Sequence, residues 1–311
     1  MTKPYLDFSE YYKAHFAYKV QKISLNAGST CPNRDGSLGQ GGCTYCNNHS
    51  FSPGYTSRIR PIVEQLRDGI DFFSHKYPQM RYLAYFQSYT NTYGDRGRLR
   101  AMYEEALAQP GVVGLVVGTR PDCVDEDWLH YFGRLGERTR VYIEYGVEST
   151  LDRTLRRVNR GHTFGEAAAT IRATAEMGVD CGAHLIIGLP GESRADFRHH
   201  VAELSALPIT SIKLHQLQIL KNTTMGRDYL RDPESFSLMS AEEYLEVAIE
   251  LLRHMRPNLY VDRFVSQSPP ELILAPRWAV KNYIFTNNLV NTMVSRGCRQ
   301  GDVYGLGSDP I

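Results

Sequence analysis

The 311-residue sequence lacks several features that would point to particular classes of protein. It has almost no net charge, because 35 lysines and arginines face 34 aspartates and glutamates, so nucleic-acid binding would require a local basic patch. No apolar run approaches the length of a membrane-spanning helix, and residues 1–10 contain no apolar signal-peptide core. Six cysteines in a chain of this length do not form a disulfide framework. We therefore expect a cytoplasmic protein without a membrane partner.

The sequence also lacks repeats shorter than a strand–helix unit, low-complexity segments and any linker long enough to divide it. Instead, short apolar runs alternate at least five times with longer amphipathic stretches. The apolar runs predict strands at residues 20–26, 82–87, 112–117, 141–147, 181–188, 210–220 and 260–265. The amphipathic stretches predict helices at residues 62–75, 98–108, 125–135, 163–177, 193–205 and 241–254, and over most of 275–294. For the fourth of these, Thr163 and Glu166 form a capping-box pattern.

This alternation predicts an α/β fold with a parallel sheet and right-handed crossovers. An incomplete parallel barrel is the preferred form, and a doubly wound open sheet is the alternative. In both forms, chemistry collects at the C-terminal ends of the strands. Residues 221–240 form a polar break, so we expect a barrel over residues 1–220 and a small C-terminal extension, packed on it, over residues 221–311.

Three of the six cysteines, Cys31, Cys43 and Cys46, fall within sixteen residues of a glycine-rich segment. Thiolates this close, on backbone that can turn sharply, suit a soft metal centre. Two centres are open: His49 follows Cys46 at a spacing that would complete a Cys3His zinc site, whereas three thiolates alone suit a 4Fe–4S cluster with one open iron. The segment follows the first expected strand, at the catalytic rim of a barrel, and this position favours the cluster.

Four phrases in order, CPNRDG…GGCTYCN, RGHT, LIIGLPGE and LQILKNT, resemble the radical S-adenosylmethionine (radical SAM) superfamily over about residues 5–295. Most members have Cys-x3-Cys-x2-Cys, whereas eleven residues separate the first two cysteines here. The longer spacing is similar to the group related to the catalytic subunit of the elongator complex, and within it to small bacterial proteins of the YhcC type. The resemblance implies a partial (β/α)6 barrel of radical SAM type and a 4Fe–4S cluster on Cys31, Cys43 and Cys46.

The resemblance also implies the chemistry. In the family, the fourth iron binds the methionine amino and carboxylate groups of S-adenosylmethionine, and an electron from the cluster cleaves a carbon–sulfur bond to give a 5′-deoxyadenosyl radical. The electron would come from a donor such as flavodoxin or ferredoxin. Relatives in the elongator-like group act on the wobble uridine of tRNA, which implies a tRNA-modifying transferase or lyase. The alternatives are a radical SAM enzyme for a small metabolite or protein, and a non-catalytic module stabilised by zinc.

Several residues are candidates for binding the cofactor. Gln87 and Ser88 stand where family members often carry Gly-Gly-Glu against the methionine amino group, although a polar strand end capping a turn is equally compatible. In the similar coproporphyrinogen oxidase branch, a polar side chain of the fourth strand contacts the ribose, and Glu148 matches it. An arginine twelve residues later binds the methionine carboxylate, and Arg160 stands at that spacing. The alternative for Arg160 is membership of a solvated arginine series.

Other candidates lie inside the expected strands. Glu144 needs a partner, because an unpaired buried carboxylate costs several kcal/mol, and a cationic or polar ligand in the barrel mouth would supply one. His184 and Gly188 belong to a strand similar to the family's adenine-binding strand. His184 replaces an aspartate there, and a lone histidine on an apolar strand is more often a satisfied core residue. Lys213 and His215 share one strand face, and the pattern does not say whether that face points inward.

Basic residues recur along the chain and would receive phosphates if they lined one rim. Ordinary solvated faces are the alternative. The residues are Lys19, Lys22, Arg58, Arg60, Arg96, Arg98, Arg100, Arg153, Arg156, Arg157 and Arg160.

Overall fold

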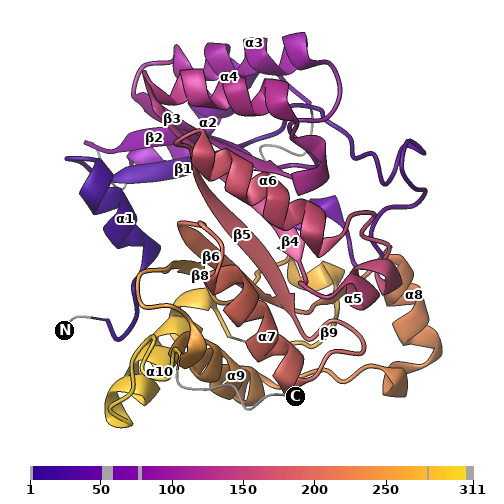
Figure 1. Ribbon diagram of the computed structural model, residues 1–311. Helices are drawn as coiled ribbons and strands as arrows, with labels where there is room; N and C mark the ends of the chain where they lie inside the picture. The colour runs from indigo at the N-terminus through magenta and orange to yellow at the C-terminus, as the bar shows by residue number, and fades with distance from the viewer. Residues whose placement is uncertain (1–2, 51–58, 76–78, 279, 306–311) are drawn as a thin grey trace.

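The computed structural model describes residues 3–50, 59–75, 79–278 and 280–305, without the side chain of His49. A seven-stranded sheet with the order β1-β2-β3-β4-β5-β6-β8 forms its centre, and all six neighbouring pairs are parallel. The sheet curls into an open half-barrel, which confirms the predicted incomplete parallel barrel (Figure 1). Its strands are β1 (Val20–Leu25), β2 (Arg81–Phe86), β3 (Val112–Thr119), β4 (Arg140–Glu148), β5 (Asp180–Ile187), β6 (Ser211–Gln216) and β8 (Tyr260–Arg263).

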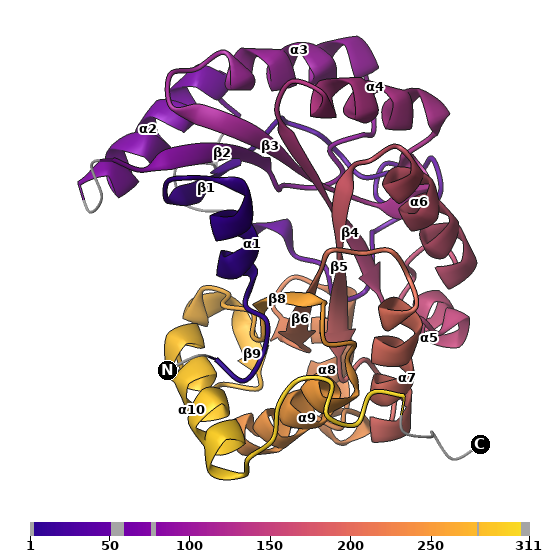
Figure 2. The ribbon, with the colours of Figure 1, turned by 60° about the vertical axis from the view of Figure 1, so that its left-hand side comes forward.

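Helices cover the convex outer face of this sheet, as Figures 1 and 2 show. The covering helices are α2 (Ile62–Ser74), α3 (Arg96–Leu107), α4 (Glu126–Gly136), α6 (Phe164–Glu176), α7 (Arg194–Ser205) and α9 (Ala241–His254). The remaining helices are α1 (Phe8–His15), α5 (Asp152–Arg157), α8 (Thr224–Arg231) and α10 (Asn282–Ser295). In the part of the chain that the structure describes, no helix is both long and apolar enough to span a membrane.

The two faces of the sheet have different chemistry, as β4 illustrates. Its outward residues Ile143 and Tyr145 are fully buried in the main core beneath the helices. Its inward residues include Glu144, which faces the barrel interior with polar side chains of other strands. The N-terminal end of the interior is apolar, because Phe8 and Tyr11 of α1 pack there against inward aromatic and aliphatic side chains of the sheet. The half-barrel is therefore plugged at one end and polar towards the other.

Several boundaries differ from the prediction. The single strand expected at 210–220 is wrong: β6 ends at Gln216, and β7 (Ile219–Leu220) pairs antiparallel with β9 (Ile273–Ala275) in a separate small sheet. That pairing also delays the last helix, which begins at Asn282. Helix α8 lies within the expected polar break, and β8 brings a strand from beyond residue 221 into the main sheet. The division into residues 1–220 and 221–311 stays a prediction.

Candidate active site

A cavity of about 250 Å³ opens at the C-terminal ends of the strands. Its lining brings together most of the residues that the sequence singled out, namely Cys31, Cys43, Cys46, Gln87, Glu144, Glu148, Arg160 and His184. Ser88 is buried beside it without lining it, and Gly188 lines a separate small cavity. Segments widely separated in sequence therefore converge on one hollow, as expected at this end of a parallel barrel.

The cysteine-rich segment folds as a sequence of tight turns. The Cys46 N–H donates to the Cys43 carbonyl at 3.0 Å, and the Arg34 N–H donates to the Cys31 carbonyl at 2.8 Å. Gly42 has a φ of 79°, and a Cβ there would lie 2.9 Å from two atoms of the Arg34 side chain. That side chain crosses the turn, and its Nη2 donates to the Cys46 carbonyl at 2.8 Å. The glycine is thus required both for the turn and for the arginine packed against it.

Two distant parts of the chain hold this segment against the barrel. The Thr44 N–H donates to the Val158 carbonyl at 3.0 Å, and the Met225 N–H of α8 donates to the Thr44 carbonyl at 2.8 Å. The Asn47 side chain donates to the Lys221 carbonyl at 2.9 Å. The position of the cysteines consequently depends on the chain after β4 and on the C-terminal part.

The thiols lie in a partly buried setting with donors aimed at them. Asn33 Nδ2 and Arg160 Nη1 each lie 3.6 Å from the Cys43 sulfur, within donating distance. Burial and the neighbouring Cys43 raise the pKa of the Cys46 thiol to about 11, although Arg34 opposes them. Because metals bind thiolates, a metal centre here would displace the proton that the Cys46 thiol retains at neutral pH.

Arg160 is buried and held at the end of β4. Its Nη2 donates to the Gly146 carbonyl at 2.5 Å and lies 3.9 Å from Glu148 Oε1. A Cβ on Gly146 would lie 2.7 Å from this Nη2 and 2.6 Å from the same carboxylate oxygen, so glycine provides the space for both groups. Glu148 itself adopts a left-handed φ of 70°. The interpretation of Arg160 as one of a solvated series is wrong, because only Arg153, Arg156 and Arg157 of that series are exposed.

A buried network fixes the turn that follows Glu148. Ser149 Oγ donates to Glu192 Oε1 at 2.6 Å, and the same oxygen lies 3.2 Å from His200 Nε2. The other ring nitrogen of His200 lies 2.7 Å from the Thr150 hydroxyl. Glu192 ends the LIIGLPGE phrase, so one role of that phrase is to hold the strained end of β4. Sequence reasoning did not assign this role.

Arg120 is a second buried arginine of the cavity wall, and sequence reasoning missed it. It is 2% exposed, and its Nε and Nη2 donate to the two carboxylate oxygens of Asp122 at 2.9 and 2.8 Å. Its Nη1, like Arg160 Nε, has no partner among the described residues. Unpaired buried guanidinium N–H groups attract an anionic ligand. In the sequence, the only signal for Arg120 as a cavity residue was its position directly after β3.

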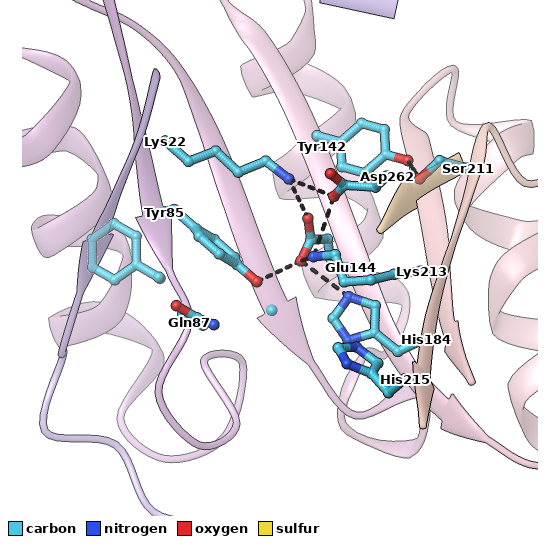
Figure 3. A network of polar contacts seen from close by, with 12 residues as sticks. Lys22, Tyr85, Gln87, Tyr142, Glu144, His184, Ser211, Lys213, His215 and Asp262 are labelled. Atoms are coloured by element: carbon cyan, nitrogen blue, oxygen red, sulfur yellow. Dashed lines mark hydrogen bonds and ion pairs between the residues drawn. The ribbon is translucent and has the colours of Figure 1, made fainter. Parts of the chain in front are cut away.

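The deeper wall is a charged network around Glu144 (Figure 3). Glu144 Oε1 lies 2.6 Å from Lys22 Nζ, and Oε2 lies 2.7 Å from Lys213 Nζ. The Tyr85 hydroxyl donates to the same Oε2 at 2.5 Å, and His184 Nε2 lies 3.0 Å from it. The partner expected for Glu144 therefore comes from the chain itself. Lys213 points inward, which settles the orientation of β6; Figure 3 also shows His215 beside His184.

The network has a clear effect on the ionisation of its members. Burial alone would raise the pKa of the Glu144 carboxyl, but the ammonium groups of Lys213 and Lys22 outweigh it and hold this pKa well below its ordinary value. Burial and the charge of Lys213 lower the pKa of His184. Burial and the adjacent His184 lower the pKa of His215 well below its ordinary value. At neutral pH the wall thus presents an ionised carboxylate beside two neutral imidazoles.

The sequence model of the radical SAM superfamily matches residues 27–204, and that of the Radical SAM C-terminal domain matches residues 209–295. The chain belongs to the radical SAM superfamily. It is 31% identical to YtqA of Bacillus subtilis over 97% of this chain and 93% of that protein. It is 36% identical to YhcC of Escherichia coli K12 over 85% of this chain and 84% of that protein. These relatives confirm the predicted YhcC-type group.

A solved structure shares the fold. Elp3 of the archaeon Methanocaldococcus infernus superposes with a TM-score of 0.68 at 18% identity, over 93% of this chain and 68% of that one. A tRNA uridine(34) acetyltransferase of Methanocaldococcus infernus is 27% identical over 43% of this chain and 25% of that protein. The first comparison confirms a radical SAM partial barrel, and the second covers only part of the chain.

Radical SAM enzymes use a 4Fe–4S cluster and S-adenosylmethionine and need a reductant, and this chain is such an enzyme. The residues fit both groups: three thiols share one cavity with buried guanidinium N–H groups that have no partner among the described residues. Among the described side chains, no three His, Cys, Asp or Glu groups are arranged to hold a single metal ion. A cluster distributes its thiolates over separate irons. The histidine of the zinc alternative, His49, lies outside the described side chains.

We expect the Glu144 network to govern acid stability. Because the folded-state pKa of Glu144 lies below its ordinary value of 4.5, its ion pairs stabilise the fold above that pH and are lost as the pH falls through the lowered pKa. Glu144→Gln should lower the free energy of unfolding by about 3 kcal/mol near pH 7, since it leaves two buried ammonium groups without this carboxylate. Denaturant unfolding of both proteins from about pH 7 to about pH 3 should show this difference shrinking.

Glu104→Gln serves as the control, because the Glu104 carboxylate pairs with Arg138 at the surface and should contribute less than about 1 kcal/mol. A difference between wild type and Glu144→Gln that stays constant over the acid range would contradict the assignment.

We further predict that Cys31→Ala, Cys43→Ala and Cys46→Ala each lose bound iron and sulfide after anaerobic reconstitution, because each removes one cluster thiolate. Cys123→Ala and Cys298→Ala should retain both, since these cysteines do not line the cavity. Iron and sulfide assays with the visible charge-transfer band provide the measurement.

The His49→Ala variant separates the two metal interpretations. It should keep its iron if three thiolates hold a cluster. Full iron content in all three cysteine variants would refute the ligand assignment, and zinc bound in place of iron, and lost with His49, would favour the Cys3His site.

Proposed function

We propose that this enzyme modifies the wobble uridine of tRNA, with a cluster on Cys31, Cys43 and Cys46 and S-adenosylmethionine beside it. The observation that carries this proposal is the partial likeness to a tRNA uridine(34) acetyltransferase, together with the basic character of the cavity. Among the described lining residues, five cations, Arg34, Arg120, Arg160, Lys213 and Arg263, outnumber the two carboxylates of Glu144 and Glu148. A positive cavity favours a polyanionic substrate.

The rim offers a second basic feature, on α5. Arg156 and Arg157 are exposed and make no ion pair with any described residue. Arg157 lies against the turn after β5, because a Cβ on Gly191 would be 2.6 Å from its Nη1. By contrast, Arg96 and Arg100 pair with carboxylates of the chain. Arg153 of the same helix is already paired with Asp196, and Arg58 lies outside the described residues. Of the basic residues noted in the sequence, Arg156 and Arg157 would therefore contact phosphates.

Within this proposal each cavity residue has a role. When bound, the cluster and S-adenosylmethionine supply a 5′-deoxyadenosyl radical. Arg160, with an unpaired Nε, would hold the methionine carboxylate. Gln87 and Ser88 would lie near the methionine amino group, and Glu148 near the ribose.

His184 and Gly188 take their roles from the family pattern, and Glu144 takes its role from its contact with His184. His184 and Gly188 would belong to the strand that receives the adenine. Glu144 would position His184 by accepting a hydrogen bond from its Nε2. The electron would come from flavodoxin or ferredoxin, and the reaction would take place in the cytoplasm.

Mass spectrometry of tRNA nucleosides from a strain that lacks this protein tests the proposal. One modified uridine should be lost and a precursor that differs only in its C5 substituent should accumulate. The wild-type gene should restore the profile, and a Cys46→Ala gene should not, because it would remove a cluster ligand. A Cys298→Ala gene should restore it and controls for the loss of any cysteine.

An unchanged nucleoside profile would refute the tRNA substrate and leave the radical SAM assignment intact. The substrate would then be a small metabolite or a protein. Loss of the modification in the strain carrying the wild-type gene would point to a secondary effect of the deletion.

A further inference from the structure

The cavity wall at the β6–β8 side carries a cation, Arg263. Arg263 is the last residue of β8, which lies at the opposite edge of the sheet from β1, and its side chain lines the cavity. Within the described ranges it makes no hydrogen bond and no ion pair, although it is half-buried. A guanidinium in such a position keeps two adjacent N–H edges available for a ligand.

The neighbouring charges leave Arg263 uncompensated. Asp262 is engaged by Lys22 at 3.1 Å and by Lys213 at 3.3 Å, and Glu144 is engaged by the same two lysines. The imidazoles on this wall are neutral at pH 7, because burial lowers the pKa of both His184 and His215. Lys22 and Lys213 together balance Asp262 and Glu144, so the charge of Arg263 is in excess among these groups, although Asp262 is close enough to interact with it electrostatically.

The segment after Arg263 is fastened in place, so this part of the wall is already built. The Ser266 N–H donates to Gln216 Oε1 at 2.7 Å, and Gln216 Nε2 donates back to the Ser266 carbonyl at 3.1 Å. The Ser268 hydroxyl donates to Gln218 Oε1 at 2.7 Å, and His215 Nδ1 hydrogen-bonds the Ser266 hydroxyl. All five of these residues line the cavity. Such a wall can fix a bound group without ordering a loop first.

We propose that Arg263 binds an anionic oxygen group of the substrate, a carboxylate or a phosphate, against this wall. A guanidinium recognises either group through two parallel N–H···O contacts. The proposal deepens the proposed function and rests on it only in that the substrate enters this cavity. It places the anionic group at the β6–β8 side of the cavity.

The test uses the reconstituted holoenzyme with Arg263→Gln, Arg263→Lys and, as a matched control, Arg172→Gln on the exposed face of α6. Three probes are titrated: tRNA from a strain lacking the protein, the unmodified transcript of the same tRNA, and inorganic phosphate. Arg263→Gln should weaken binding of the cellular tRNA about tenfold or more, and Arg263→Lys less, because a lysine keeps the charge and loses the two-pronged contact. Arg172→Gln should bind like wild type.

The probes distinguish the source of the anion. If Arg263 binds a backbone phosphate, Arg263→Gln weakens both RNAs equally and lowers the salt dependence of binding by about one phosphate contact. If it binds a carboxylate on the modified base, only the cellular tRNA is affected.

The failure of this proposal differs from the failure of the tRNA proposal. If wild type binds neither RNA but binds phosphate in a way that Arg263→Gln weakens, the tRNA substrate is wrong and the anion site stands. If Arg263→Gln binds all three probes as Arg172→Gln does, the anion site is refuted whatever the substrate is.

Discussion

The structure depends on one buried carboxylate. Glu144 lies on the central strand of the half-barrel, and the groups that satisfy it come from β1, β2, β5 and β6. The ammonium groups of Lys22 and Lys213 extend the network to Asp262 of β8. Glu144 is 2% exposed, and the desolvation free energy of such a buried carboxylate without partners would be prohibitive. The strands must therefore curl far enough for these groups to meet. The network thereby allows a polar cavity where an ordinary barrel has an apolar core.

The cavity has two chemically distinct sides. On one side, the thiols of the cysteine segment lie beside Arg160 and Arg120, and backbone contacts from Val158 and Met225 hold that segment in place. On the other side, neutral histidines and Arg263 line the wall built by β5, β6 and β8. S-adenosylmethionine beside the cysteine segment, with its adenine towards β5, and a substrate towards β6 and β8 would be brought together in one cavity. The orientation of the reacting groups would then come from the strand ends and from a cysteine segment that hydrogen bonds fasten to the rest of the chain.

The parts of the structure that could be predicted are those with a local signal. The apolar runs predict all seven strands of the main sheet, and the Thr163–Glu166 capping box is present at α6. The separation of β7 from β6 could not be predicted, because it depends on pairing with β9 more than fifty residues later. The direction of Lys213 was equally hidden: both faces of its strand are mixed, and only its contact with Glu144 decides. Arg120 and Arg263 stand out only once their burial and partners are known.

We expect Cys31, Cys43 and Cys46 to hold a 4Fe–4S cluster whose fourth iron is open to S-adenosylmethionine. Electron paramagnetic resonance of the reduced holoenzyme, before and after S-adenosylmethionine is added, tests it most directly. The account predicts a cubane signal whose g values change when S-adenosylmethionine is added, because a new ligand alters the electronic structure of the cluster. A signal that is identical with and without S-adenosylmethionine, in a protein that retains its full iron content, would contradict it.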